Sequence, residues 1–326
     1  MVKVAVVGVG WQGQTHVKTL LCMQNVDVVG LCDLDAACVR SVAAKFRVNP
    51  YSDYEGMLDA ARPDAIVICT PPAVRLQLVE PAATRGIHCF IEKPPAKDLA
   101  TARDVDKILQ RSGVLHAVGF MFRYGRAVES CRQLIVGRRV ALVRSAMLDG
   151  LALRPNWPRW FFDKARSGGP IFDQGIHLVD LSRYLLGEVD SVAGFQGNLV
   201  VPKSADFTVE DSATCLFRYQ RGTLQNHTHA WAVEGFRAEM ELISDELQLT
   251  LDLGGKSLRG NIAGEEVNQS FPEDDYYGLE LEAFVEAVES GDRSVIRSTY
   301  TDSVASLRTT LAAVKALEES CVVTLE

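Results

Sequence analysis

The sequence lacks any apolar stretch approaching the roughly 18–20 residues that a membrane-spanning helix requires. It also lacks low-complexity tracts and internal repeats, so its composition is that of an ordinary globular protein. Positive charge is not in excess, since the formal net charge is −8. This balance argues against nucleic acid or an anionic membrane as the main partner, although it leaves room for a local basic pocket.

Paired cysteines are missing as well. The eight cysteines are scattered, with no CxxC pair and no spacing typical of a metal site. Several lie in apolar runs, such as Cys32 in VVGLCD and Cys69 in AIVICT, where cysteine acts as a small hydrophobic residue. We therefore expect no disulfide framework and a reducing compartment.

The N-terminal stretch MVKVAVVGVGWQG has one lysine and a short apolar run before its glycines. A signal peptide would need a longer apolar region and a small-residue cleavage site. We therefore expect a soluble, cytoplasmic protein.

With 326 residues, the chain is longer than one hydrophobic core usually serves, which favours two domains. In the first 120 residues, short apolar runs alternate with helical segments. Strands are predicted at 2–7, 26–33, 64–70, 87–92 and 114–120, and helices at 12–24, 36–46, 73–85 and 98–111. This alternation predicts an α/β domain over residues 1–120, with a parallel sheet covered on both faces.

The pattern changes after residue 120. A helix is predicted at 126–136, and strand-like runs then follow one another without helices between them. These runs are VDSVAGFQGNLVV, DSATCLFRYQ, GTLQNHTHAWAV, AEMELISDE and LQLTLDL. Helices return at 277–290 and 299–319. Residues 121–326 are therefore expected to form an α+β domain with a large, mainly antiparallel sheet.

A glycine-rich turn lies between the first strand and the first helix. Gly8 suits a tight turn, Gly10 close approach of a pyrophosphate, and Gly13 packing of the helix on the strand. The helix start, with Trp11 and Gln12, offers free N–H groups to phosphate oxygens. The segment predicts a dinucleotide site; the alternative is a purely structural turn.

Asp33 ends the second strand, where a dinucleotide-binding fold places an acid on the ribose hydroxyls. Leu34 and Asp35 follow, with no arginine or serine to accept a 2′-phosphate. We therefore favour NAD over NADP. The alternative role for Asp33 is a helix cap.

Glu92, Lys93 and Pro94 leave the fourth strand at its carboxyl end, the edge where open α/β sheets bind ligands. The positive charge of Lys93 could stabilise an alkoxide, and Pro94 fixes the direction of the turn. The alternative is an ordinary solvated lysine.

Residues 168–180, GGPIFDQGIHLVD, carry a polar stripe at the start of a predicted helix. Asp173, His177 and Asp180 fall on one face at positions i, i+4 and i+7. Three interpretations compete: a helix cap with a core histidine, a metal site that includes His227 and His229, and proton transfer.

Several of these motifs occur together and in a fixed order. They are Gly8-x-Gly10-x-x-Gly13-x-x-His16, Asp33, CTPP at 69–72, Glu92-Lys93-Pro94, GFMFRY at 119–124 and GGPIFDQGIHLVD. In this combination the chain resembles the Gfo/Idh/MocA family, named after glucose–fructose oxidoreductase and inositol dehydrogenase. The resemblance spans the whole chain. It implies an N-terminal Rossmann domain, a C-terminal domain with a large antiparallel sheet, and NAD(P)-dependent oxidation or reduction of sugars and cyclitols.

The resemblance also implies roles for single residues. Lys93 matches the family's EKP lysine, whose bond to Pro94 is often cis, and Asp173 and His177 complete an active-site trio. Further cofactor contacts are expected from Thr70, Pro71 and Glu92. Many members have Thr-Pro-Asn-x-x-His where this chain has Thr70-Pro71-Pro72-Ala73-Val74-Arg75. A homodimer or homotetramer packed through the C-terminal sheet is also implied.

Given a dinucleotide site and Lys93, the polar stripe is best interpreted as the proton-handling part of a hydride-transfer site. His177 would remove the hydroxyl proton while hydride leaves the same carbon. Asp173 would bind the substrate or orient His177, Lys93 would stabilise negative charge, and Asp180 would support them. No metal is predicted.

The segment LRPNWPRWFFDKARSGGP at 153–170 combines aromatic and basic residues. Arg154, Trp157 and Trp160, with Tyr124 upstream, are candidate substrate contacts, because aromatic faces stack on sugars and guanidinium groups bind hydroxyls. The alternative is a surface loop that buries its aromatic rings, or a subunit contact.

These features predict an NAD-dependent oxidoreductase that acts on a secondary hydroxyl or ketone of a sugar, cyclitol or sugar derivative. Two other functions use the same scaffold: an NAD-dependent glycosidase that oxidises its substrate transiently, and a non-catalytic sugar sensor. The presence of Lys93, Asp173 and His177 argues against the sensor.

Overall fold

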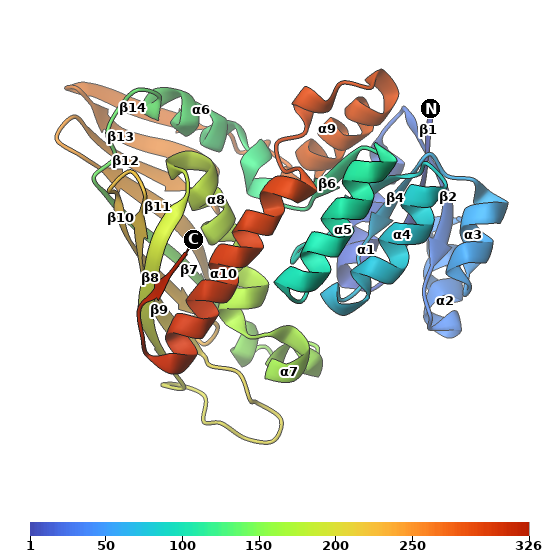
Figure 1. Cartoon of the computed structure of the whole chain (residues 1–326), viewed down its shortest axis with the longest axis horizontal. Coiled ribbons are helices and arrows are strands. Elements are labelled where there is room, and N and C mark those ends of the chain that lie inside the picture. The colour runs from blue at the N-terminus through green and yellow to red at the C-terminus, as the bar shows by residue number, and fades with distance from the viewer. Residues whose placement is uncertain (326) are drawn as a thin grey trace. The chain divides into compact units, whose positions relative to one another are not determined.

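The computed structural model describes residues 1–325, which divide into two compact units (Figure 1). The first unit contains Met1–Met121 and Asp275–Leu307. The second contains residues 122–274 and 308–325. The sequence predicted one boundary after residue 120; the structure differs, because residues 275–307 return to the first unit.

The first unit is built on a six-stranded sheet with strand order β3-β2-β1-β4-β5-β6, in which every pairing is parallel. The strands are β1 (Val2–Val7), β2 (Val26–Cys32), β3 (Pro50–Tyr51), β4 (Ala65–Ile68), β5 (His88–Ile91) and β6 (His116–Val118). This is the strand order of a dinucleotide-binding Rossmann fold, and it confirms the predicted α/β class.

Helices connect these strands. They are α1 (Trp11–Cys22), α2 (Ala36–Phe46), α3 (Tyr54–Ala61), η1 (Pro72–Val74), α4 (Arg75–Thr84) and α5 (Leu99–Ser112). The short β3 and α3 were not predicted. Asp53 caps α3 by accepting a hydrogen bond from the Gly56 N–H, a local signal that the hydrophobic pattern alone does not reveal.

The core of the first unit explains why the chain returns to it. The four residues of β4 are all buried, as expected for a strand covered on both faces. Helix α9 (Tyr276–Ser290) adds Leu281, Phe284 and Val285 to the same apolar cluster. The rings of Phe90 and Phe284 are 5.6 Å apart. The apolar face of α9 is therefore buried against residues almost 200 positions away in sequence.

The second unit contains a nine-stranded sheet with order β14-β13-β12-β11-β7-β10-β9-β8-β15. Its strands are β7 (Leu142–Asp149), β8 (Val189–Gly197), β9 (Ser212–Tyr219), β10 (Leu224–Ala230), β11 (Phe236–Ile243), β12 (Leu247–Asp252), β13 (Ser257–Ile262), β14 (Glu265–Ser270) and β15 (Val323–Thr324). All pairings are antiparallel except that of β7 with β10. The predicted large, mainly antiparallel sheet is confirmed.

Helical segments complete the second unit: η2 (Met121–Tyr124), α6 (Arg126–Ile135), η3 (Leu151–Leu153), η4 (Arg159–Phe162), α7 (Lys164–Ser167), η5 (Ile171–Gly175) and α8 (Ile176–Leu186). Two further segments lie near the C-terminus: η6 (Arg293–Val295) belongs to the first unit, and α10 (Tyr300–Glu319) begins in the first unit and ends in the second. Burial alternates along β9, so that one face of the sheet is covered and the other is open.

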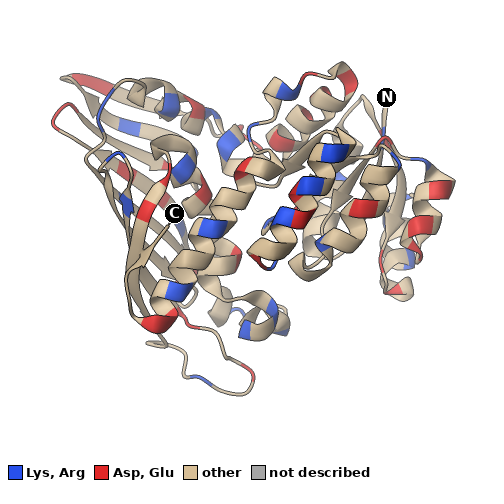
Figure 2. Cartoon of the chain, viewed as in Figure 1, with Lys and Arg blue, Asp and Glu red and all other residues tan. Residues whose placement is uncertain are grey.

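Surface charge is mixed in sign. Blue segments, for basic residues, and red segments, for acidic ones, are interspersed over the helices in Figure 2. In the sequence of α5, Arg103, Asp104, Asp106 and Lys107 illustrate this mixture. None of the described helices has both the length and the apolar character needed to cross a bilayer.

Candidate active site

The glycine turn after β1 has three glycines with three different surroundings. Gly8 has φ +88°, and a Cβ there would lie 2.9 Å from the carbonyl carbon of Cys69. A Cβ on Gly13 would lie only 1.9 Å from the Gly8 carbonyl oxygen. At Gly10, by contrast, a Cβ would meet nothing within 4 Å. The protein's own packing therefore explains Gly8 and Gly13, whereas Gly10 is left open, as close approach of a phosphate would require.

The start of α1 suits an anion. Its N-cap residue is Gly10, no side chain caps it, and its first turn contains no acid. The free N–H groups and the partial positive charge of a 12-residue helix are therefore available to a ligand. Trp11, in the first turn, is 67% exposed. The residues present fit a dinucleotide pyrophosphate.

Asp33 follows β2 and faces the same turn. One carboxylate oxygen, Oδ2, accepts a hydrogen bond from the Val9 N–H at 2.9 Å. The other, Oδ1, accepts from the Asp35 N–H at 3.0 Å. The N-cap of α2 is Asp35, which accepts from Ala37 and Cys38. The cap interpretation of Asp33 is therefore wrong, and Asp33 is tied to the glycine turn.

Arg75 explains the departure from the usual family motif after β4. Its buried guanidinium donates from Nη1 to the Ile68 carbonyl at 3.0 Å and to Thr70 Oγ1 at 3.3 Å. Its Nη2 donates to the Glu92 carbonyl at 2.9 Å. Burial lowers the pKa of Arg75 to about 10. Arg75 thus ties together the ends of β4 and β5, next to Thr70 and Pro71.

Glu92 connects the glycine-turn helix to the lysine turn. Its Oε1 lies 2.6 Å from His16 Nε2 and accepts from Gln12 Nε2 at 3.0 Å. Its Oε2 accepts from the backbone N–H of Lys93 at 3.0 Å. Lys93 is half-buried and the Lys93–Pro94 bond is cis, as the family resemblance implied.

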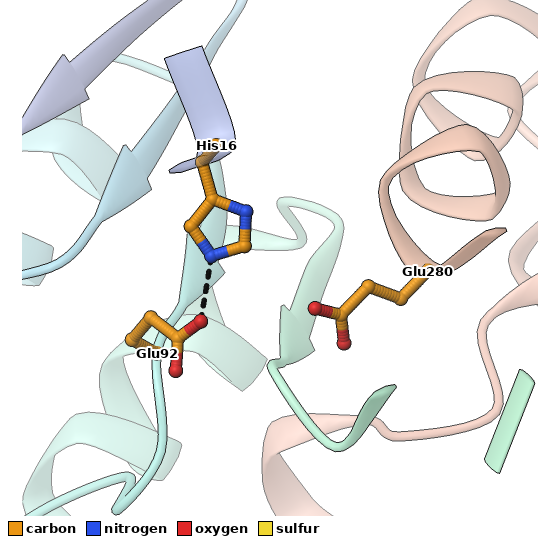
Figure 3. A group of neighbouring side chains, drawn as sticks. All are labelled: His16, Glu92 and Glu280. Carbon is orange, nitrogen blue, oxygen red and sulfur yellow. Dashed lines mark hydrogen bonds and ion pairs between the residues drawn. The ribbon is translucent and has the colours of Figure 1, made fainter. Parts of the chain in front are cut away.

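A further acid, which sequence reasoning missed, belongs to this cluster. Figure 3 shows the Glu280 carboxylate directed from α9 toward the His16–Glu92 pair. Ligand atoms of the three side chains lie within 4.8 Å of one another, and Glu280 is fully buried. Burial, and then the charges of Glu92 and Asp275, raise the pKa of Glu280 well above its usual value. One sequence feature could have revealed Glu280: it lies between Tyr276 and Phe284 at positions i, i+4 and i+8, which form one buried face of α9.

The segment that carries Asp173 and His177 is not a regular α-helix. Residues Ile171–Gly175 form a π-helical turn, and α8 begins only at Ile176. The sequence predicted an α-helical face here, so the periodicity was wrong for the first turn. Asp173 is half-buried within the π turn, and His177 is 8% exposed in the first turn of α8. Single π turns occur frequently at functional sites.

Asp180 forms a buried ion pair. Arg123 donates to it twice, from Nε at 2.7 Å and from Nη2 at 2.5 Å. The neighbouring Phe122 lies edge-on to the His177 ring, with centroids 5.5 Å apart. Asp180 thus anchors the segment whose Phe122 contacts His177. Tyr124, from the same segment, is buried.

His227 and His229 lie on β10 and are both buried. His227 Nδ1 is 2.9 Å from Ser145 Oγ. Burial lowers the pKa of His227 to about 4; the pKa of His229 is lowered by burial and then by His227. Among the described residues, one group of three or more His, Cys, Asp or Glu side chains lies close enough together to hold a metal ion. It consists of His16, Glu92 and Glu280, and it does not include His227 or His229. The two β10 histidines are neutral core residues.

The aromatic loop packs into a small core. Trp157 and Phe161 join a buried cluster around Trp231, and the rings of Trp160 and Phe161 are 4.0 Å apart. This packing agrees with the alternative stated from the sequence, a surface loop that buries its aromatic rings. A pocket of about 310 Å³ beside it is lined by Arg154 and other residues of the loop.

Hydrogen bonds link this loop to the π turn. Trp231 Nε1 donates to Gln174 Oε1 at 2.8 Å, and Gln174 Nε2 donates to Asp149 Oδ2 at 3.2 Å. Arg154 Nη2 donates to the other Asp149 oxygen at 2.6 Å. Gln174 directly follows Asp173, so the loop and the π turn form one connected polar and aromatic assembly.

The predicted residues therefore divide between the units. In the first unit, hydrogen bonds tie Asp33 to the glycine turn, and Gln12 and the Lys93 N–H to Glu92. Arg75 donates to both Thr70 and the Glu92 carbonyl. The second unit contains Tyr124, Arg154, Trp157, Trp160, Asp173 and His177.

Comparison with known proteins follows the same division. A family model described as "Oxidoreductase family, NAD-binding Rossmann fold" matches residues 2–120. A second model, described as "GFO/IDH/MocA C-terminal domain", matches residues 131–250.

Individual proteins are also similar to this chain. D-apiose dehydrogenase of Paraburkholderia graminis is 30% identical over 233 residues, which cover 68% of this chain but only 58%, less than two thirds, of that enzyme. The scyllo-inositol 2-dehydrogenase (NAD(+)) of Bacillus subtilis is 26% identical, with 100% of this chain and 96% of that protein covered. The structure of levoglucosan dehydrogenase with NADH and levoglucosan superposes with a TM-score of 0.88 at 18% identity, covering 100% and 99% of the two chains. At that identity the likeness concerns the fold.

Proposed function

Because the chain belongs to the Gfo/Idh/MocA oxidoreductase family, we propose that it is an NAD-dependent dehydrogenase or reductase of small polyols. The reaction transfers hydride between the nicotinamide and a secondary hydroxyl or ketone of a sugar, cyclitol or sugar derivative. Relatives named for apiose and scyllo-inositol support this substrate class.

The observation that carries the proposal is the open position at Gly10. Backbone atoms lie close to the Cβ position of Gly8 and of Gly13, whereas a Cβ on Gly10, at the uncapped start of α1, would meet no other part of the protein within 4 Å. Gly8, Gly10, Trp11, Gln12 and Gly13 would hold the pyrophosphate side of NAD. Thr70, Pro71, Glu92 and Lys93 would hold the nicotinamide side.

Bound NAD would supply the hydride acceptor for alcohol oxidation. The imidazole of His177 would take the proton from the substrate hydroxyl, and in reduction it would return that proton. Lys93 Nζ would stabilise negative charge that develops on the substrate oxygen, and Asp173 would accept a hydrogen bond that orients substrate or imidazole. Tyr124, Arg154, Trp157 and Trp160 would contribute to substrate binding.

We expect NAD to be preferred over NADP. The Asp33 carboxylate is held in place by the Val9 and Asp35 N–H groups. A fixed carboxylate can accept hydrogen bonds from the ribose hydroxyls, and it repels a 2′-phosphate. Leu34, which follows, is 94% exposed and offers no positive charge.

The test is absorbance of reduced nicotinamide with purified protein, NAD and a panel of cyclitols, aldoses and sugar acids. Net accumulation of NADH with at least one polyol is expected. Cleavage of a glycosidic bond without net NADH would instead identify the glycosidase. If the protein binds a sugar but turns over no member of the panel, it is the sensor.

We also propose a homodimer or homotetramer that packs through the open face of the nine-stranded sheet. Four apolar side chains on that face are about half exposed or more: Leu142, Phe195, Leu216 and Leu224. Exposed apolar patches of this kind are typical of subunit interfaces.

A further inference from the structure

Glu280 is a buried acid for which the proposed reaction gives no role. It lies on α9, its relative exposure is 0%, and neither carboxylate oxygen accepts or donates a hydrogen bond. His16 Nδ1, in the same cluster, is also buried without a partner. An ionised carboxylate in such a place would lose its hydration and gain no donor in return, so burial strongly disfavours the ionised form.

The neighbouring Glu92 is in the opposite situation. Gln12 Nε2 and the Lys93 N–H donate to its carboxylate, and His16 Nε2 lies 2.6 Å away. Several donors on one carboxylate favour its ionised form. Two ionised carboxylates within 4.8 Å in a buried cluster would repel each other strongly. Glu92 therefore carries the charge, and a proton remains on Glu280.

Titratable groups from every neighbouring element bear on this arrangement. They are His16 on α1, Cys69 after β4, Glu92 after β5, and Asp275 and Tyr277 at the start of α9. Burial raises the pKa of both the Cys69 thiol and the Tyr277 hydroxyl, so both stay neutral at pH 7. Arg75, the nearby cation, is engaged by the carbonyls of Ile68 and Glu92.

We propose that Glu280 is a positioning residue that acts as a neutral carboxylic acid, with its O–H directed to the Glu92 carboxylate. One bridging water, with two hydrogen bonds of about 2.8 Å each, spans a separation of this size. The Glu280 O–H then donates to this water, and the water donates to the Glu92 carboxylate, in addition to the donors from α1 and the lysine turn. Glu92 in turn holds the Lys93 backbone, so Glu280 sets the direction of the lysine that the proposed function places at the substrate.

This inference rests on the proposed function for its kinetic consequence, but not for the protonation state. Two substitutions distinguish a need for a hydrogen-bond donor at position 280 from a need for side-chain volume. Glu280→Gln keeps the shape and an N–H donor, whereas Glu280→Leu keeps the approximate volume and removes the donor. Glu286→Gln, at an exposed position of the same helix, is the matched control.

For Glu280→Gln, we expect kcat and the NAD dissociation constant within about 2-fold of wild type, because the amide replaces the acid as donor. For Glu280→Leu, we expect kcat to fall about 10-fold or more while the NAD dissociation constant changes less than about 3-fold. We expect kcat to change more than the NAD dissociation constant because the Glu280 donor positions the Lys93 turn, whereas the glycine turn is not altered by the substitution. Equal kcat values for the Leu and Gln variants would overturn the positioning role.

Protonation is tested without turnover. The infrared spectrum of wild type at pH 7 should contain a protonated carboxyl C=O band that Glu280→Gln lacks and Glu286→Gln retains. Above a glutamate pKa of about 4.3 the unfolded chain releases this proton while the folded chain keeps it, so wild-type stability falls as the pH rises. The melting temperature of Glu280→Gln relative to wild type should therefore increase between pH 5 and 8.

The opposite results would refute the neutral acid. Absence of the infrared band, or stoichiometric zinc or manganese bound by wild type but not by Glu280→Gln, would show that Glu280 is ionised. Because these readouts need no substrate, they stand even if no polyol is oxidised. In that case the failure belongs to the proposed function and not to the protonation of Glu280.

Discussion

At the scale of single residues, His177 is the side chain on which the proposed chemistry depends most. It is buried in the first turn of α8, against Phe122, whose segment is anchored by the Arg123–Asp180 ion pair. A positioned general base contributes about 10²–10⁴-fold to turnover. We expect His177→Ala to lower kcat by about that factor and to leave the NAD dissociation constant within about 2-fold, as measured by NADH absorbance and calorimetry.

Asp33→Ala should have the opposite effect to His177→Ala: it should weaken NAD binding more than it lowers turnover. Loss of a charged acceptor for the ribose hydroxyls should cost about 1.5–3 kcal/mol, or roughly 10–100-fold in NAD affinity. Turnover at saturating NAD should change much less than in His177→Ala. Near-normal kcat in His177→Ala on the best substrate would refute the assigned acid–base role.

Residues could be predicted from the sequence where the chemistry is local. Gly8, Asp33 and Lys93 lie directly after β1 and β2 and shortly after β5, where a short motif predicts them. Their roles at the site stay predictions. Arg75 and Glu280 could not be assigned in this way. The partners of Arg75 include a carbonyl 17 positions away, and Glu280 meets its cluster only because α9 packs onto the first unit.

At the scale of elements, substitutions in the glycine turn can distinguish effects on packing from effects on ligand binding. Gly13→Ala places a Cβ against the Gly8 carbonyl oxygen, so both the melting temperature and NAD affinity should fall. In Gly10→Ala the added Cβ would meet no other part of the protein within 4 Å. Its stability should drop by no more than about 1 kcal/mol, the usual cost of Ala at an N-cap.

Gly10→Ala should nevertheless weaken NAD binding about 10-fold or more, because the methyl group occupies space that the pyrophosphate requires. Thermal unfolding without NAD and calorimetric titration with NAD check the two effects separately. Wild-type NAD affinity in Gly10→Ala would contradict the placement of the pyrophosphate at this turn.

Element types were predictable where periodicity is strong, as in the alternating strands and helices of the first unit. The π turn at Ile171–Gly175 was not, because apolar spacing does not distinguish one π turn from an α-helical start. The parallel pairing of β7 with β10 was also beyond prediction, since β7 was not recognised as a strand and its partner lies some 80 residues away.

At the scale of the whole molecule, the fold class of both sheets could be predicted and the path of the chain between them could not. Helix α9 was assigned to the second domain by its place in the sequence. Its buried Leu281, Phe284 and Val285 belong instead to the core under β1 and β5. Apolar periodicity shows that a helix has a buried face but not which core that face joins.

The open face of the nine-stranded sheet carries a continuous apolar line. Leu142 on β7 pairs directly with Leu224 on β10. Leu216 on β9 lies diagonal to Leu224, and Phe195 on β8 lies diagonal to Leu216. Diagonal neighbours on one face are close enough for side-chain contact. The line thus crosses four adjacent strands, and the proposed homo-oligomer would bury it against a second copy of the chain.

Leu216 lies inside this line and is 55% exposed, so a lysine there can be solvated in a monomer but not in a packed interface. We expect light scattering after size exclusion to show a dimer or tetramer for wild type and a monomer for Leu216→Lys, with little change in the unfolding of the monomer itself. Val136→Lys, at an exposed apolar position after α6 (69% exposed), should keep the wild-type mass. A wild-type monomer, or a Leu216→Lys variant with unchanged mass at equal concentration, would exclude this face as the subunit interface.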